Sequence, residues 1–317
     1  MCHDTVPGTN PKNRCQALHE LRTLLRSVEI LGYLLLCLIW STTWQAIRIC
    51  LTGYPPMFGA SLRFLIAAAL LLVVVRARKL PLRLPGGRPQ HLALLIAGIV
   101  NGLGYACVYL AELKLSGGTT AIICASSPLF TLIVARMFGL EPLLLRRLLG
   151  MSIGLGGMAA LFWEGQTLGD GQIRAMLFAL VAAAVMWPIY GALLKRYAHD
   201  LPPLLSTLYF LFYTALTLLV LAPLRGESWP NIAAAPAQAH LALMYLAVFG
   251  SVVAWSIYLA LLQRLDLSVL STLGLVQPVL ALGLDLVLRE AQLGPRGYLG
   301  ALLVLVAMGL STWPLRR

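Results

Sequence analysis

Charged side chains are scarce in this sequence. Only 11% of its 317 residues are Asp, Glu, Lys or Arg, whereas 59% are hydrophobic, and the mean hydropathy is +0.83. A water-soluble domain could not bury that much apolar surface, so a lipid bilayer must solvate it. Helices of roughly 20 apolar residues, joined by short loops, use up the whole length and leave no room for a separate soluble domain.

Groupings of side chains that would support catalysis or metal binding are also missing. The five histidines lie in the N-terminal tail or in loops, and the six cysteines are scattered without the spacing of metal ligands. The cysteines in apolar segments are best explained as small apolar fillers. The glycine run 154–157 follows no strand and predicts no phosphate-binding loop. The sequence therefore predicts no enzyme, no cofactor and no metal site.

Acidic residues are too few to build a proton pathway through the membrane. Glu112 and Asp285 are expected near the ends of spans, at the membrane interface, and neither has a second carboxylate or a histidine nearby in sequence. A proton relay of buried acids is therefore not expected. A membrane-embedded enzyme acting on lipids is disfavoured for the same reason, because it would need His, Asp or Glu converging at the membrane face.

The first 29 residues are polar, mixed in charge and without a cleavage-type site. The apolar segment that follows is too long for a signal peptide and is expected to remain as a span. Ten apolar segments fill the chain after Glu29. Their expected ranges are 30–51, 55–75, 90–111, 117–138, 146–163, 171–194, 203–223, 238–262, 267–288 and 296–314.

The second half of the chain looks like a rewritten copy of the first. Pro128 and Arg146 recur 150 positions later as Pro278 and Arg296, and Tyr109-Leu110-Ala111 recurs as 258–260. A repeat with an odd number of spans must insert its two copies in opposite orientations, an arrangement typical of secondary transporters. We therefore predict an all-α integral membrane protein of ten transmembrane helices in two inverted five-helix repeats. The tail is expected at 1–29 and the repeats at 30–164 and 170–315.

The positive charge is distributed as a topology signal. The formal net charge is +12, but most Lys and Arg lie in alternate connections, as positive-inside segments do, and nucleic acid is not an expected partner. This pattern places both termini in the cytoplasm. Short loops and the high content of Ala, Leu and Arg favour a bacterial inner (plasma) membrane. The expected partners are the lipid bilayer and a small-molecule substrate, and the sequence leaves monomer and homodimer open.

Arg63 is the most informative single residue. It lies about nine residues into the second expected span, among apolar neighbours, where a guanidinium is costly unless it meets water, a carboxylate or backbone carbonyls. One interpretation is a cavity-lining cation that attracts an anionic group of a substrate. The other is a structural Arg that fixes helix packing, and the sequence does not choose between them.

Prolines, aromatic residues and amides supply the other candidates. Pro128 and Pro278 are expected in the middle of the fourth and ninth spans, where each would kink its helix and free a carbonyl. The kinks could merely fit neighbouring helices together, but their equivalent positions in the two repeats favour carbonyls that face a cavity. Aromatic and amide side chains recur at helical spacing, and as a group they favour a cavity for a small amphipathic molecule. The candidate substrate-binding residues are Trp44, Gln45, Arg63, Asn101, Tyr105, Ser127, Pro128, Trp187, Tyr190, Trp255, Tyr258, Gln277 and Pro278.

Three short patterns together resemble the EamA-type branch of the drug/metabolite transporter superfamily. They are Trp40-Ser41 at the start of the first span, Pro56 followed by Arg63, and 126–129 through Glu141 and Gly150, repeated as 277–279 through Glu290 and Gly300. The resemblance covers about Leu31 to Leu310. It implies ten helices in two inverted repeats, cytoplasmic termini, and a central metabolite cavity framed by Arg63 and the two proline-containing helices.

These observations predict a secondary-active transporter. We expect efflux of a small metabolite, either an amino acid or related compound or a drug-like compound, by alternating access. Exchange of metabolites or nucleotide-sugars is the alternative. The sequence does not identify the substrate, the direction of transport or the coupling ion.

Overall fold

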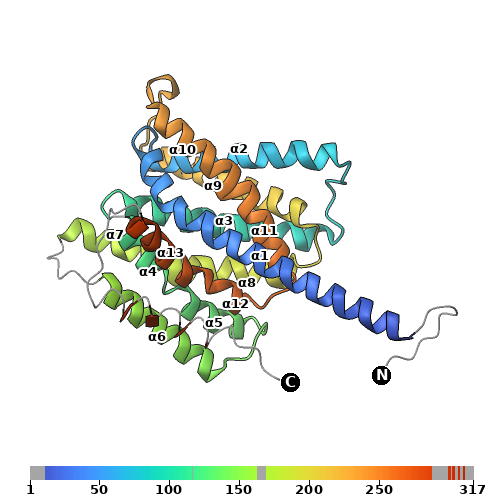
Figure 1. Ribbon diagram of the computed structural model, residues 1–317. Coiled ribbons are helices and arrows are strands. Elements are labelled where there is room, and N and C mark those ends of the chain that lie inside the picture. The colour runs from blue at the N-terminus through green and yellow to red at the C-terminus, as the bar shows by residue number, and fades with distance from the viewer. Residues whose placement is uncertain are drawn as a thin grey trace.

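A computed structural model describes residues 11–115, 117–162 and 169–287, with seven further positions between 299 and 310. Every regular element in these residues is a helix (Figure 1). Three long continuous helices begin the chain: α1 (Pro11–Leu51), α2 (Pro56–Ala77) and α3 (Gly87–Glu112). The first of them starts inside the expected N-terminal tail, and its N-terminal part extends beyond the bundle (Figure 1).

The remaining elements are mostly shorter or interrupted helices. They are α4 (Gly117–Cys124), α5 (Ser127–Met137), α6 (Leu145–Phe162), α7 (Asp170–Val181), η1 (Ala182–Met186), α8 (Trp187–Tyr197), α9 (Pro203–Leu224), η2 (Ile232–Ala234), α10 (Ala237–Ala247), η3 (Val248–Val253), α11 (Ala254–Leu262), α12 (Leu267–Ser271) and α13 (Leu273–Val287). Two of these, η1 and η3, are π-helical turns inside otherwise continuous helices.

Six helical stretches are long and apolar enough to cross a membrane. They are Ser27–Leu51, Pro56–Ala77, Gly87–Glu112, Asp170–Tyr197, Pro203–Leu224 and Ala237–Leu262. They match six of the expected spans to within a few residues, and α6 occupies the place of the expected fifth span. Most of the expected tenth span, 296–314, lies outside the described residues, as do Glu290 and Arg296.

The expected fourth and ninth spans are discontinuous helices. The first is interrupted after Cys124 and resumes at Ser127, and the second is interrupted at Thr272. The expectation of two mid-helix prolines was therefore wrong for Pro128, which lies in the first turn of α5. Proline is tolerated there because the first-turn N–H groups have no partner inside the helix. Pro278, by contrast, does lie inside α13, six residues after the interruption.

Close helix packing through small residues organises the bundle. An ideal Cβ on Gly98 of α3 would lie 2.5 Å from Tyr213 Cβ of α9, so only a glycine lets the two helices approach this closely. One turn further on, Asn101 Nδ2 donates a hydrogen bond of 3.0 Å to Thr214 Oγ1, again between α3 and α9. Asn101 is fully buried in this interface, and an amide there holds helices together.

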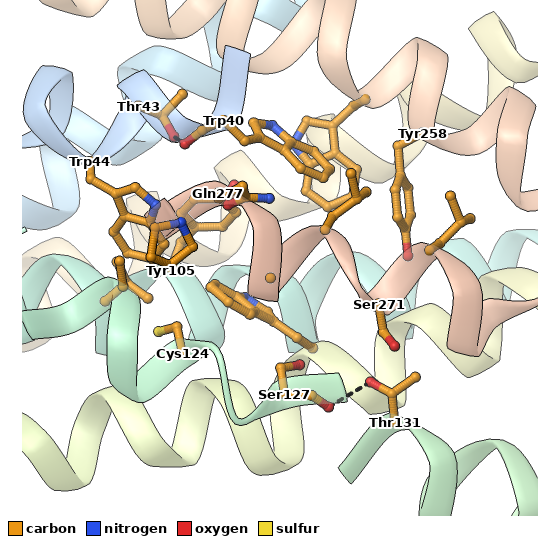
Figure 2. A pocket seen from close by; sticks show the side chains of 18 of the residues that line it. Trp40, Thr43, Trp44, Tyr105, Cys124, Ser127, Thr131, Tyr258, Ser271 and Gln277 are labelled. Carbon is orange, nitrogen blue, oxygen red and sulfur yellow. Dashed lines mark hydrogen bonds between the residues drawn. The ribbon is translucent and has the colours of Figure 1, made fainter. Parts of the chain in front are cut away.

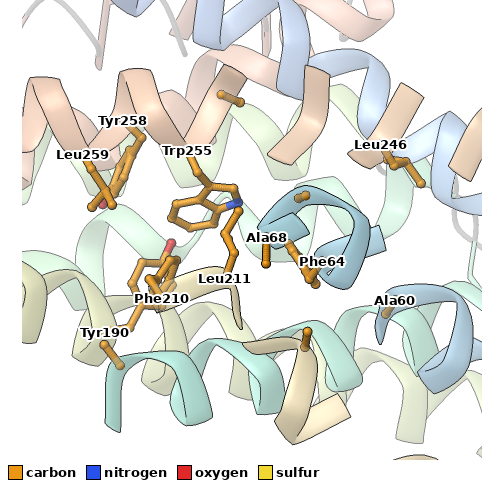
Figure 3. Packing of buried hydrophobic residues seen from close by; sticks show 14 of the residues in the cluster. Ala60, Phe64, Ala68, Tyr190, Phe210, Leu211, Leu246, Trp255, Tyr258 and Leu259 are labelled. Atoms are coloured by element: carbon orange, nitrogen blue, oxygen red, sulfur yellow. The ribbon is translucent and has the colours of Figure 1, made fainter. Parts of the chain in front are cut away.

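Aromatic rings fill the centre of the bundle. Trp255 of α11 packs edge-on against Phe210, with 4.9 Å between ring centroids, and against Tyr258 at 5.3 Å and Tyr190 at 5.6 Å (Figure 3). The outside of the bundle is also apolar, with large exposed side chains such as Val73 and Leu241. The core is apolar because its side chains pack against one another, and the exterior is apolar because a membrane would solvate it.

Candidate functional site

A cavity of about 110 Å³ lies between helices from the two halves of the chain (Figure 2). At about 10–15 Å³ for each water position, it holds roughly ten water molecules, or one small organic molecule. Its walls come from α1–α5, α8 and α11–α13. The lining residues are Trp40, Thr43, Trp44, Ile47, Arg63, Tyr105, Val108, Ala121, Cys124, Ser127, Thr131, Trp187, Tyr190, Trp255, Tyr258, Leu267, Leu270, Ser271, Leu273, Gly274, Gln277 and Pro278.

One face of α1 forms a wall of the cavity. Trp40, Thr43, Trp44 and Ile47 all line it, and their spacing of three, four and seven residues places them on one side of the helix. Gln45 follows Trp44 directly but is rotated about 100° from it, and the structure leaves Gln45 exposed and outside the cavity. The placement of Gln45 among the substrate contacts is therefore corrected.

Arg63 lies in the cavity wall with 1% of its surface exposed. Its Nε donates to Ser251 Oγ at 2.8 Å, and its Nη2 donates to the carbonyl oxygen of Gly250 at 3.1 Å, both in the π-helical turn η3. Its Cζ lies 4.8 Å from the centroid of the Phe64 ring and 5.1 Å from that of Tyr105. Within the described part of the chain, no carboxylate forms an ion pair with Arg63. The guanidinium thus has polar and aromatic neighbours but no anion.

The two discontinuous helices form another wall. Ser127 and Thr131 face the cavity from α5, and the Thr131 hydroxyl donates to the Ser127 carbonyl at 2.9 Å (Figure 2). Ser271 and Gln277 face it from α12 and α13. The breaks meet near Gly274, where an added Cβ would lie 3.7 Å from Pro128 Cδ. Interrupted helices give a membrane cavity polar groups that continuous apolar helices lack.

A third wall is aromatic. Trp40 lies 5.4 Å from Trp255 and 5.6 Å from Tyr258 between ring centroids, so rings from α1 and α11 meet beside the cavity. Trp187 and Tyr190 add to it from α8. The arrangement offers flat apolar surfaces on one side and the Arg63 charge on another, which suits a molecule with an apolar part and an anionic group.

Ten of the thirteen candidate residues line this cavity. Their contact with a substrate remains a prediction. Those ten are Trp44, Arg63, Tyr105, Ser127, Trp187, Tyr190, Trp255, Tyr258, Gln277 and Pro278. Gln45, Asn101 and Pro128 are not among the lining residues. Gln45 is exposed, Asn101 donates a hydrogen bond to Thr214 of α9, and Pro128 packs at the helix break near Gly274.

Four lining residues with polar groups were not among the candidates. They are Trp40, Thr43, Thr131 and Ser271. Trp40 and Thr43 could have been found from their spacing to Trp44, and Thr131 from its position one turn after Ser127. Ser271 had no such signal, because the end of α12 is set by a helix break that the sequence does not mark.

A buried ion cluster ties two connections together close to the cavity. Arg147 Nη1 donates to Glu141 Oε2 at 2.7 Å and to Ser268 Oγ at 2.6 Å, and its Nη2 donates to Asp266 Oδ2 at 2.9 Å. The Ser268 amide and hydroxyl both contact the Glu141 carboxylate as well. The cluster therefore joins the α5–α6 connection to the start of α12, whose Leu267 lines the cavity. Among the described residues, no group of three or more His, Cys, Asp or Glu side chains could hold a metal ion.

The sequence is similar to one family of membrane transporters over most of its length. The model of the EamA-like transporter family matches residues 27–163 and again 174–313. An uncharacterized inner membrane transporter of Escherichia coli (strain K12), YedA, is 30% identical over 252 residues, which cover 78% of either chain. Protein PagO of Salmonella typhimurium (strain LT2) is 26% identical over 264 residues, covering 82% of this chain and 84% of its own.

Two further matches extend over most of the chain. An uncharacterized transporter of Bacillus subtilis (strain 168), YoaV, is 23% identical over 292 residues, covering 91% of this chain and 98% of its own. A solved crystal structure of a protein covers 90% of this chain and 96% of its own, with a TM-score of 0.73 and 22% identity. At 22% identity, this similarity supports the fold and says nothing about function.

Proposed function

The chain belongs to the EamA-like transporter family and is a multi-pass membrane transporter, and from this premise we propose that it exports a small metabolite by alternating access. The substrate class is an amino acid or related compound, or a drug-like compound of similar size. Transport is secondary-active, driven by an ion or substrate gradient. The membrane is the bacterial inner membrane, with both termini in the cytoplasm as the distribution of basic residues favours.

For the architecture we propose ten transmembrane helices in two inverted five-helix repeats, at 30–164 and 170–315. Two observations support it. The family model matches the chain twice, once in each half. The discontinuous helices also pack crosswise, α4 against α13 and α5 against α12, so that the first part of each contacts the second part of the other. Two copies inserted in opposite orientations would pack in this antiparallel way.

The observation that carries the function is the cavity with its buried guanidinium. Arg63 lies in the wall with no carboxylate paired to it among the described residues, and polar and aromatic side chains from both halves share the same space. A substrate carboxylate would supply the missing negative charge, and its apolar part would pack on the aromatic wall. A volume of roughly ten waters suits an amino acid and is small for a nucleotide-sugar.

Ligand-induced thermal stabilisation tests this proposal. Purified protein in detergent is screened against amino acids, organic acids, sugars and nucleosides, and a true ligand raises the unfolding temperature because it binds the folded state. At a ligand concentration of 100 times Kd the expected gain is about 2.7 kcal/mol.

Two glutamines give a matched pair of variants for the screen. Gln277 lines the cavity and Gln45 is exposed outside it, so Gln277→Ala should reduce the shift and Gln45→Ala should leave it unchanged. Equal shifts in both variants would contradict binding in this cavity. Counterflow into vesicles preloaded with the same ligand then separates obligatory exchange from net export.

A further inference from the structure

A buried carboxyl group lies at the end of α3, one turn beyond the cavity. Glu112 exposes 5% of its surface, and neither of its carboxylate oxygens has a hydrogen-bond partner among the residues that the structure describes. The sequence places this residue at the membrane interface, where water would solvate it. α3 does end at Glu112, as expected for a span end, but the side chain is packed inside the protein and not in water.

The helix face that carries Glu112 is the one that faces the cavity. Tyr105 and Val108 line the cavity from α3, and Glu112 follows them by seven and four residues, so the three side chains lie on one stripe of the helix. Val108 packs in a cluster that includes Trp44 and Cys124, two further lining residues. The Trp44 indole Nε1 is likewise buried without a hydrogen-bond partner among the described residues. Two unsatisfied polar groups thus flank this end of the cavity.

Charged and titratable groups act on Glu112 from three neighbouring helices. Arg48 of α1 and Arg63 of α2 contribute positive charge, and Cys124 of α4 contributes a thiol. On α7, which packs against α3, Asp170 and Arg174 are both exposed. Neither arginine forms an ion pair with Glu112 at hydrogen-bonding distance within the described part of the chain. Their attraction is therefore longer-ranged than a direct pair.

The burial decides which form of the carboxyl group this conformation favours. A carboxylate removed from water without hydrogen bonds is far more costly than the neutral acid. The buried surroundings of Glu112 thus favour the acid, whereas water that entered the cavity from one side would stabilise the ion. If the cavity opens and closes during transport, the charge of this group is linked to that change.

From this linkage we propose that Glu112 is the proton-binding site that couples transport to a proton gradient. When the cavity is open to one compartment, the wetted carboxylate accepts a proton from water and forms an O–H bond. The neutral acid can then be buried as the cavity closes. When the cavity opens to the other compartment, the O–H bond breaks and water there accepts the proton. The proposal rests on the transport function proposed above.

The first test needs no substrate. Infrared difference spectra of the full-length protein in lipid, recorded between acidic and alkaline buffer, should contain the carbonyl band of a titrating buried carboxylic acid. Glu112→Gln should abolish that band. Glu29→Gln should keep it, because Glu29 lies on α1 outside the cavity, 3.8 Å from Arg264 Nη1. A spectrum without the band, or one that Glu112→Gln leaves unchanged, overturns the proposal.

A flux measurement tests directly whether substrate transport is coupled to a proton gradient. Radiolabelled L-leucine is the probe, since its carboxylate suits Arg63 and its side chain suits the apolar wall. In proteoliposomes a pH difference of about one unit can drive up to about tenfold accumulation under one-to-one coupling. Glu112→Gln should reduce the accumulation ratio to about one while retaining leucine counterflow, and Glu112→Asp should restore part of it.

The outcomes separate the two proposals. Accumulation that persists in Glu112→Gln, or wild-type counterflow without any response to the pH difference, overturns proton coupling through Glu112 and leaves transport standing. A wild-type protein that moves no amino acid contradicts the proposed substrate class instead, and the infrared band then decides the role of Glu112 alone.

Discussion

Replacing Arg63 by methionine separates its two possible roles. Methionine keeps the length of the side chain and removes the charge and both hydrogen bonds to η3. The structure shows what those two acceptors would lose. Ser251 Oγ also donates to the Leu246 carbonyl at 2.9 Å, and the Gly250 carbonyl also lies 3.4 Å from Trp40 Nε1. Neither group is left without a partner when the guanidinium is removed.

The expected cost to stability is therefore small. Two hydrogen bonds from a charged donor amount to about 3–6 kcal/mol, at about 1.5–3 kcal/mol each. Burial of an ion costs several kcal/mol, and that cost disappears together with the charge. The two terms nearly cancel, so we expect Arg63→Met to change the free energy of unfolding by less than about 2 kcal/mol. An anionic substrate group would lose a charge-assisted contact, which weakens its binding by about 10- to 100-fold.

The assay measures both quantities on the same preparation. Thermal unfolding without ligand reports stability, and the ligand-induced shift or the transport rate, normalised to protein in the membrane, reports affinity. Arg196→Met, at an exposed position of α8, is the control for loss of one positive charge. Wild-type affinity in Arg63→Met would refute the binding role. Failure of that variant to accumulate in the membrane would refute the small stability cost and favour a structural arginine.

Three further changes test the packing by thermal unfolding in detergent. Glu141→Ala removes the buried one of the two carboxylates paired with Arg147 and should cost about 3–5 kcal/mol. Asp266→Asn changes the other, half-exposed carboxylate and should cost less than about 1 kcal/mol. Equal effects would contradict the difference in burial. Gly98→Ala should lower the free energy of unfolding by about 1–3 kcal/mol, because the added Cβ would lie 2.5 Å from Tyr213 Cβ of α9. Gly156→Ala is the matched control: its Cβ meets open space, so the substitution should raise the free energy of unfolding by about 0.5–1 kcal/mol. Asn101→Leu should cost about 0.6–2 kcal/mol without changing ligand affinity, and a change in affinity would place this amide in the transport path after all.

Apolar length predicted the six long helical stretches, and helical spacing predicted many of the residues that line the cavity. Trp44, Tyr105 and Tyr258 all line the cavity, and each was proposed from a three- or four-residue pattern of aromatic side chains. The same pattern failed for Gln45, because spacing relates residues within one helix and does not say which face meets the neighbouring helices. Asn101 failed for a related reason: a buried amide can serve a neighbouring helix as well as a cavity.

Backbone interruptions were the feature that the sequence could not locate. A proline predicts a kink at its own position, yet Pro128 only begins a new helix, and the second break falls six residues before Pro278. Breaks depend on tertiary contacts that satisfy the freed backbone groups, and one residue alone does not encode them. Burial of Glu112 was missed for the same kind of reason, since hydropathy gives the depth of a helix end but not the neighbours that cover it.

The two π-helical turns also limit which insertions and deletions the chain can tolerate. Each holds one turn wider than an α-helix. η1 ends directly before Trp187 and η3 ends two residues before Trp255, and both tryptophans line the cavity. Deleting one residue within η3 would let the segment rewind as ordinary α-helix with both ends in place. Because a π-helical turn accommodates one extra residue, α10 and α11 on either side of η3 would keep their faces, and only the wide turn with its carbonyl positions would be lost. Such a chain would keep its fold and its membrane insertion while the Gly250 carbonyl no longer lay within reach of Arg63 Nη2, so a single-codon deletion here would change the cavity wall at Arg63 without turning Trp255 away.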